Sequence, residues 1–210
     1  MSPLMTSCSQ GVKVDLAALQ PSTKKSGKGQ LVVIDPGHGG FDIGAKVQSV
    51  EEKALALKTG TLVKRYLHDM GYRVILTRSR DVFIPLKKRT AIANDTKSKL
   101  FVSIHFNAFK GTSVKGVEIY YYNKGSKWRQ NASKKVAQSV LSALLKATGA
   151  TSRGVKTGNF HVIRETYMPA ILIEGGFITN PQERNSLKDQ KYVEKMAHSI
   201  AEGVDKYFRS

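Results

Sequence analysis

Four short segments of the chain carry side chains that could build a hydrolytic zinc site. They contain His38, Glu52 or its neighbour Glu51, His105 and Glu174. Two neutral imidazoles and one carboxylate suit zinc, because such a ligand set leaves a fourth position open for water. The remaining residue is then free to act as a base. The pattern indicates hydrolytic zinc chemistry.

Each histidine directly follows an apolar run. His38 lies in the glycine-rich segment 35–40 after the run 31–34, where glycines let the backbone present a side chain into a crevice. His105 closes the run 100–104. Taken alone, His38 could be a surface histidine and His105 a hydrogen-bonded core residue. If the two strands are neighbours, both histidines point toward the same edge of the sheet, and this pairing weakens the alternative for His105.

The acidic candidates differ in how much they indicate. Glu51 and Glu52 open a predicted helix, where the helix dipole favours a carboxylate even without a metal. Glu174 follows the apolar run 170–173 and precedes two glycines. Burying a carboxylate is costly unless a cation or a donor compensates, so we favour a functional role for Glu174.

Alternating apolar runs and amphipathic stretches predict the elements that position these residues. Strands separated by helical crossovers predict a single α/β domain, with a mostly parallel central sheet covered by helices on both faces and ligands at the carboxyl ends of strands. The expected strands are 31–34, 72–77, 100–104, 116–122, 160–163 and 170–174; the expected helices lie over 52–70, after Pro85, over 128–148 and around 192–207.

The composition is that of a globular domain with a leader. With 210 residues, 40% hydrophobic and 24% charged, the chain is long enough for one buried α/β core. Residues 1–30 are rich in Ser, Lys, Gln and Gly and predict a flexible basic leader. The folded domain is therefore expected over residues 31–210.

The formal net charge of +18 would attract any polyanion. The sequence shows no base-reading motif and its lysines are scattered, so a solvated basic surface is favoured over specific nucleic-acid binding. Attraction to anionic wall polymers is expected.

The sequence shows no apolar stretch of about 18 residues that would predict a membrane span. Its single cysteine, Cys8, excludes an internal disulfide. Residues 5–8 loosely resemble the end of a lipoprotein signal that would lipidate Cys8, but the apolar segment before them is missing, so a disordered leader or a truncated chain is favoured.

Together, the segments that carry His38, Glu52, His105 and Glu174 resemble the zinc-dependent N-acetylmuramoyl-L-alanine amidases of the amidase 3 family. These are the bacterial wall-cleaving enzymes of the AmiA, AmiB and AmiC type. The likeness covers residues 31–208, and the joint order of its pieces is far more specific than any one piece. The matching stretches are 33–40, Glu52-Lys53, Arg89 with Ala93-Asn94, 103–108, and Arg164-Glu165 leading into 168–174.

The resemblance implies a role for each candidate residue. His38, Glu52 and His105 would bind one zinc ion, and Glu174 would be the catalytic carboxylate. Glu52 is preferred to Glu51 because the ligand glutamate of the family directly precedes a lysine.

The resemblance also places Asn107 and Arg164 within matched or adjoining stretches, as substrate-binding candidates. The paired donors of Arg164 suit a peptide carboxylate. An ion pair between Arg164 and Glu165 or another surface acid is the alternative.

The implied reaction is hydrolysis of the amide between N-acetylmuramic acid and L-alanine in peptidoglycan, by an enzyme exported to the periplasm or cell envelope, for wall remodelling, septum splitting or wall turnover.

Some family members insert an inhibitory helix after the strand of the second histidine. Only residues 109–115 separate that strand from the next here, so we expect no such insert; an activator stays unknown. Two alternatives are a metallopeptidase that cuts within the stem peptide and a noncatalytic module that binds the wall or polyanions.

Overall fold

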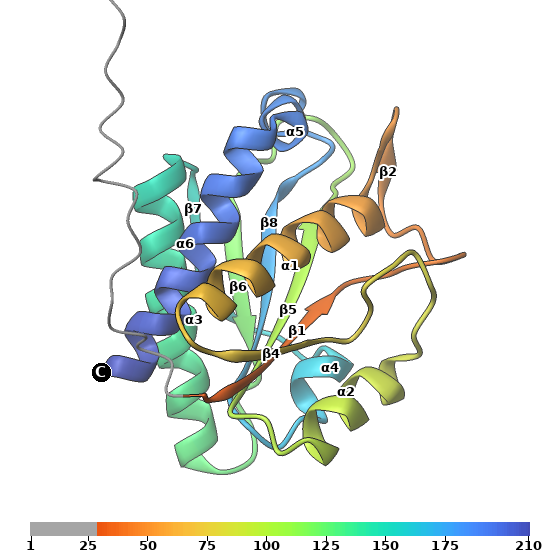
Figure 1. The fold of residues 1–210 in the computed structure, drawn as a ribbon. Coiled ribbons are helices and arrows are strands. Elements are labelled where there is room, and N and C mark those ends of the chain that lie inside the picture. Colours follow the sequence, from red (N-terminus) through yellow and green to blue (C-terminus); the bar gives the residue numbers. More distant parts are fainter. Residues whose placement is uncertain (1–28) are drawn as a thin grey trace, which may run out of the picture.

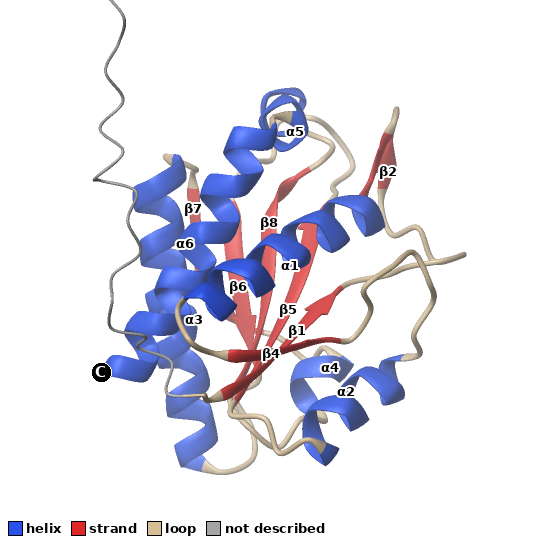
Figure 2. Cartoon of the chain, in the orientation of Figure 1, coloured by secondary structure: helices blue, strands red, loops and turns tan. Residues whose placement is uncertain are grey.

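A six-stranded sheet forms the centre of the structure, a computed structural model that describes residues 29–210 (Figures 1 and 2). The first four strands in spatial order run parallel, β6 is antiparallel to β8, and β7 is parallel to β6. The mostly parallel sheet is thus confirmed. Its spatial order is β4 (Arg73–Leu76), β1 (Leu31–Pro36), β5 (Leu100–Asn107), β8 (Ala170–Phe177), β6 (Val117–Tyr121) and β7 (Ser152–Thr157).

Helices cover both faces of the sheet, as expected. Three long helices pack on one face: α1 (Glu52–Asp69), α3 (Lys127–Thr148) and α6 (Gln190–Arg209). The other face carries α2 (Leu86–Asp95) and the single turn α4 (His161–Arg164). Both faces are buried because side chains alternate along each strand: Val32 and Ile34 join the first core, and Val33 joins the second.

The two faces of the sheet are covered unequally: three long helices cover one face, whereas α2 and the short α4 cover the other. On the α2–α4 face, the second core contains Phe101 of β5 and Leu172 of β8. His105 and Glu174 occupy the same alternation as these residues and therefore project from this face, nearer the carboxyl ends of the strands. Both side chains are partly exposed.

Local sequence signals explain the ends of the helices. Pro85 immediately precedes α2, and Gly71, with φ of 90°, follows the end of α1. The Ser126 side chain accepts a hydrogen bond from the Arg129 amide at the start of α3, and Gly149 ends α3 with φ of 68°. A further helix, α5 (Pro181–Lys188), follows β8. None of the described helices is long and apolar enough to cross a membrane.

One predicted element is wrong: residues 160–163 form no strand, and 161–164 are helical as α4. The apolar pair Val162-Ile163 suits either structure. A distant side chain supports the helical turn, because the buried Arg129 guanidinium donates to the carbonyl oxygens of Ile163 and Met168. Such a contact has no local signal in the sequence.

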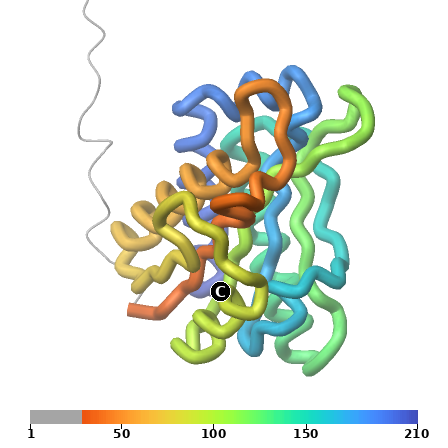
Figure 3. The backbone as a smooth tube through the Cα atoms, turned by 90° about the vertical axis from the view of Figure 1, so that its right-hand side faces the viewer, coloured from red at the N-terminus to blue at the C-terminus, as the bar shows by residue number. Residues whose placement is uncertain are grey.

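Other elements lacked an apolar pattern. The strand β7, at the sheet edge, reads Ser-Arg-Gly-Val-Lys-Thr and was not expected. The short hairpin of β2 (Lys46–Val47) and β3 (Val50–Glu51) lies between β1 and α1, orange in Figure 3. The expected leader, with Cys8, lies outside the described residues except for residues 29 and 30.

Candidate metal centre

The structure brings three predicted residues to one point. His38 follows β1, Glu52 is the first residue of α1, and His105 lies near the end of β5. The Glu52 Oε1 atom is 3.0 Å from His38 Nε2 and 2.9 Å from His105 Nδ1, and the two nitrogens are 3.2 Å apart. Glu51 instead pairs with the Lys46 ammonium at 2.8 Å. Glu52, not Glu51, is therefore the glutamate of the cluster.

Two buried arginines hold the backbone that carries His38. Arg78 donates to the carbonyls of Pro36 at 3.0 Å and Gly37 at 2.7 Å. Arg89 forms a 2.9 Å ion pair with buried Asp35 and donates to the His38 carbonyl at 2.7 Å. These bonds support His38 in a left-handed conformation, φ of 59°, which non-glycine residues rarely adopt.

Gly37 must lack a side chain because the His105 ring lies against it. A Cβ atom at Gly37 would be 2.2 Å from His105 Cε1. We expect Gly37→Ala to displace the ring and lower metal affinity by roughly 10- to 100-fold, comparable to loss of a supporting contact. Zinc titration would measure it. Gly149→Ala is the control: its Cβ would meet no atom within 4 Å, so it should cost some stability yet bind zinc normally. Normal zinc affinity in Gly37→Ala would contradict this geometry.

Glu52 is ionised within the cluster. Its side chain is buried, and burial alone would favour the neutral acid. Hydrogen bonds and charge interactions with His105 and His38 outweigh burial and hold the pKa of Glu52 far below its usual range. The Ala45 and Phe106 amides also donate to its two oxygens, at 2.9 and 3.1 Å. The carboxylate is thus fixed in its charged form.

Asp42 orients His38, a role that sequence reasoning missed. Its Oδ1 atom lies 2.9 Å from His38 Nδ1. Burial lowers the pKa of His38, but Glu52 and then Asp42 outweigh it and raise that pKa above its ordinary value. Carboxylates often hold the second nitrogen of a metal-binding histidine in this way. The available signal was an acid four residues after His38 in a glycine-rich loop.

The donor atoms fit a zinc ion. When Nδ1 of neutral His38 donates to Asp42, Nε2 presents a lone pair to the Glu52 oxygen, and two acceptors face each other unless a cation lies between them. Ligand atoms about 2.1 Å from zinc at tetrahedral angles are roughly 3.4 Å apart. The separations of 2.9 to 3.2 Å are close to that value. The arrangement could hold one ion.

Glu174 lies beside this cluster. It is the register partner of His105 between β8 and β5, so the two side chains leave the same face of the sheet. Its Oε2 atom is buried and has no hydrogen-bond partner within the described residues. Burial, then the charges of Glu52 and Glu118, raise the pKa of Glu174 well above its usual value. Such a carboxyl is poised to exchange a proton.

The structure ties both substrate-binding candidates to protein groups. The Asn107 amide donates to Glu118 Oε1 at 2.9 Å, and its carbonyl accepts from the Ala108 amide. Arg164 forms the alternative ion pair, with Glu165 at 2.6 Å, and also contacts Asn159. Neither side chain belongs to the metal cluster, and their contact with substrate stays a prediction.

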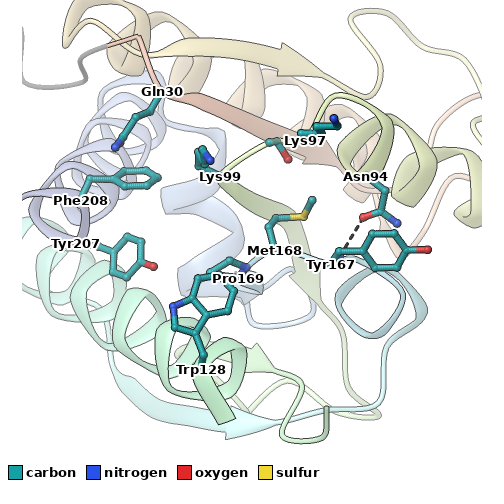
Figure 4. A pocket seen from close by; sticks show the side chains of 11 residues that line it. Gln30, Asn94, Lys97, Lys99, Trp128, Tyr167, Met168, Pro169, Tyr207 and Phe208 are labelled. Atoms are coloured by element: carbon teal, nitrogen blue, oxygen red, sulfur yellow. Dashed lines mark hydrogen bonds between the residues drawn. The ribbon is translucent and has the colours of Figure 1, made fainter. Parts of the chain in front are cut away.

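A separate pocket of about 430 Å³ opens at the opposite ends of the strands. Gln30 precedes β1, Lys99 precedes β5 and Pro169 precedes β8, whereas the metal cluster follows β1 and lies near the end of β5 (Figure 4). Trp128 from α3 also lines this pocket. The pocket is therefore distinct from the candidate metal centre.

The sequence and the fold of this chain are both similar to those of cell wall amidases. A family model described as N-acetylmuramoyl-L-alanine amidase matches residues 32–206. The "Probable cell wall amidase LytH" of Staphylococcus epidermidis is 34% identical over 186 residues, which cover 87% of this chain and 60% of LytH. N-acetylmuramoyl-L-alanine amidase LytC of Bacillus subtilis is 36% identical over 181 residues, 86% of this chain and 36% of LytC.

A solved structure matches equally well. The catalytic domain of CwlV, an N-acetylmuramoyl-L-alanine amidase from Bacillus (Paenibacillus) polymyxa var. colistinus, superposes with a TM-score of 0.80 at 39% identity. The match covers 86% of this chain and 98% of that domain. This chain thus spans less than two thirds of LytH and LytC but nearly all of a catalytic domain. The chain belongs to the amidase 3 family of N-acetylmuramoyl-L-alanine amidases.

Proposed function

We propose that residues 31–210 form a zinc-dependent catalytic domain that hydrolyses the amide between N-acetylmuramic acid and L-alanine in peptidoglycan. One observation carries the proposal: in a member of this family, the His38–Glu52–His105 cluster lies beside Glu174, whose Oε2 atom is buried and lacks a hydrogen-bond partner within the described residues. This is the combination that metal-assisted hydrolysis requires.

In this proposal His38, Glu52 and His105 would hold one zinc ion, and Asp42 keeps His38 in the tautomer that presents Nε2. When bound, the ion supplies Lewis-acid polarisation of the amide carbonyl and acidifies an attacking water. The neighbouring Ala45 and Phe106 amides keep Glu52 oriented throughout.

Glu174 moves the proton. It accepts a proton as water attacks the carbonyl carbon, and delivers a proton to the nitrogen as the C–N bond breaks. The products are the muramic acid carboxylate and a peptide with a free L-alanine amine. Because Oε2 of Glu174 is engaged by no described group, no protein hydrogen bond has to break first.

Asp42 offers a test of the supporting contacts. We expect Asp42→Asn to lower zinc affinity roughly 10- to 100-fold, because the amide removes the charge that stabilises the Nδ1 proton of His38. Competition with a chromophoric chelator would measure the change. Exposed Asp69, on α1, provides the control Asp69→Asn, which should bind zinc like the wild type. Unchanged affinity in Asp42→Asn would mean that Asp42 does not orient the ligand.

Digestion of purified peptidoglycan with and without a chelator tests the reaction itself. We expect mass spectrometry to find intact stem peptides that begin with L-alanine, formed only when metal is present. Release of terminal D-alanine would instead support a metallopeptidase. Intact peptidoglycan after digestion with the zinc-loaded protein would favour a noncatalytic wall-binding module.

We further propose that the domain acts outside the cytoplasm, in the periplasm or cell envelope, in wall remodelling, septum splitting or turnover. The name of LytH, "Probable cell wall amidase", supports this setting. The net charge of +18 would favour contact with anionic wall polymers. Residues 108–116, which join β5 to β6, include no helix that could cover the site. The purified domain should therefore be active without an activator protein, and latency would contradict this.

A further inference from the structure

A buried ionic cluster lies on the strand next to Glu174. Glu118 of β6 is the register partner of Glu174 and is only 3% exposed. His105, Glu174 and Glu118 thus form one row across β5, β8 and β6, on the same face of the sheet. The cluster is therefore adjacent to the proposed reaction centre, but the proposed mechanism does not use it.

Four donors hold the Glu118 carboxylate. Asn107 and the Tyr120 hydroxyl donate to Oε1, at 2.9 and 2.8 Å. Arg153 Nε and Lys156 Nζ donate to Oε2, at 2.8 and 2.5 Å. Burial raises the pKa of Glu118, but the bonds from Lys156, Arg153 and Tyr120 outweigh it and lower that pKa below its usual value. Glu118 is a fixed anion that positions two cations.

A bulge in β7 directs the Arg153 side chain toward the Glu118 carboxylate. Val117 pairs with Ser152, but Glu118 pairs with Gly154, so Arg153 is one extra residue in β7. Gly154 permits the bulge with φ of 86°. Bulges commonly re-aim side chains beside active sites.

Arg153 and Lys156 together carry more positive charge than the Glu118 carboxylate neutralises. One carboxylate balances one positive charge, so the trio keeps a net charge of +1. The side chains of Arg153 and Lys156 remain 35% and 37% exposed, whereas Glu118 is shielded. In the described residues Arg153 bonds Glu118 through Nε, which leaves its two terminal nitrogens for another acceptor. The ring of Phe177 lies 5.1 Å from its guanidinium carbon and restricts its movement.

We propose that Arg153 and Lys156 form a carboxylate-binding subsite that selects stem peptides with a free carboxylate on the residue after L-alanine. The proposal rests on the proposed amidase function. Adjacent strands are about 4.8 Å apart, so the cationic groups on Glu118 lie one to two strand spacings, about 5 to 10 Å, from Glu174. An extended peptide covers that distance in roughly two to three residues at about 3.4 Å each. A carboxylate near the second residue fits this span.

Calorimetry with two uncleavable product peptides tests the subsite independently of turnover. The probes are L-Ala-γ-D-Glu-L-Lys amide and its counterpart with D-isoglutamine. They differ at one position only, where the free carboxylate of D-Glu is replaced by an amide. We expect the zinc-loaded wild type to bind the carboxylate peptide about tenfold more tightly, as one charge-assisted contact would give. Arg153→Gln should abolish most of this preference, and Arg153→Lys should keep part of it.

Arg65→Gln is the matched control, because Arg65 is exposed on α1, outside the candidate site. It should leave the preference unchanged. Lys156→Gln, which leaves Arg153 on Glu118, keeps the test valid if Arg153→Gln folds poorly. The subsite would be overturned if the wild type bound the two peptides equally or bound neither measurably. It would also be overturned if Arg153→Gln and Lys156→Gln both kept the full preference for the carboxylate peptide. Failure to cleave peptidoglycan is a different result, which would overturn the proposed function.

Discussion

Replacing Glu174 with glutamine should lower the turnover of peptidoglycan by about 10²- to 10⁴-fold while the domain keeps its zinc. The amide has nearly the shape of the carboxylate but cannot accept the proton of the attacking water. The predicted ligands His38, Glu52 and His105 are unchanged, so metal content should remain at one ion per chain. Rates from soluble peptide release, together with zinc analysis of the same sample, measure both quantities.

A partly exposed glutamate on α6 supplies the matched control for this variant. Glu194 lies on α6, where its carboxylate accepts a hydrogen bond from the Gln190 side chain, so Glu194→Gln should be fully active. Near-normal turnover by Glu174→Gln would remove Glu174 from the mechanism, and loss of zinc from it would make Glu174 a ligand instead of a base.

The same substitution should stabilise the metal-free protein. Burial raises the pKa of Glu174 above the ordinary 4.5, so the folded state holds this proton to higher pH than the unfolded chain. Stability is therefore lost as pH rises through the raised pKa, and Glu174→Gln avoids the loss. We expect a Tm a few degrees above wild type at pH 8, since about 1 kcal/mol shifts Tm by about 2–4 °C in a domain of this size. The difference should shrink toward pH 4.5, and a constant difference would contradict the raised pKa.

Replacing His105 with alanine should remove both zinc and activity. Its Nδ1 atom lies 2.9 Å from Glu52 and 3.2 Å from His38 Nε2, so its loss leaves only two of the three donors. A two-donor site cannot complete the three-ligand arrangement of a catalytic zinc. We expect wild type to gain thermal stability on addition of zinc, because a ligand that binds the folded state stabilises it, and His105→Ala to gain little.

His68→Ala is the control for a lost imidazole, because His68 is 77% exposed on α1. It should bind zinc and cleave peptidoglycan like the wild type. Stoichiometric zinc in His105→Ala, or an undiminished rise in Tm, would show that the ion binds elsewhere. Activity without zinc would contradict the metal-dependent reaction.

The elements that the sequence predicts well are those with a strong local pattern. The run 31–34 and the run 100–104 are apolar because both faces of a central parallel strand are buried, and they appear as β1 and β5. The helix that ends at Gly149 has an apolar stripe and a left-handed cap. The convergence of His38 and His105 follows from their positions at the carboxyl ends of parallel strands, which the structure shows to be neighbours, β1 and β5.

The parts that were not predicted depend on long-range contacts. Arg129 reaches the turn of α4 from a distant helix and supports it by hydrogen bonds to nearby carbonyls, a contact that the apolar pair in α4 does not indicate. Glu118 carries no signal in sequence, because its partners Arg153 and Lys156 lie on a polar edge strand that depends on the register of the sheet. The choice of Glu52 over Glu51 came from the family resemblance, since a local pattern treats both glutamates alike, and the structure places Glu52 in the cluster.

X-ray absorption at the zinc edge, on the zinc-loaded domain, reports which atoms bind the ion. We expect one zinc ion per chain with two imidazole nitrogens at about 2.0–2.1 Å and at least one oxygen at about 2.0–2.2 Å. The His105→Ala protein should lose this signal and the His68→Ala protein should retain it. A first shell without histidine nitrogens, or an identical spectrum from His105→Ala, would contradict the proposed metal centre.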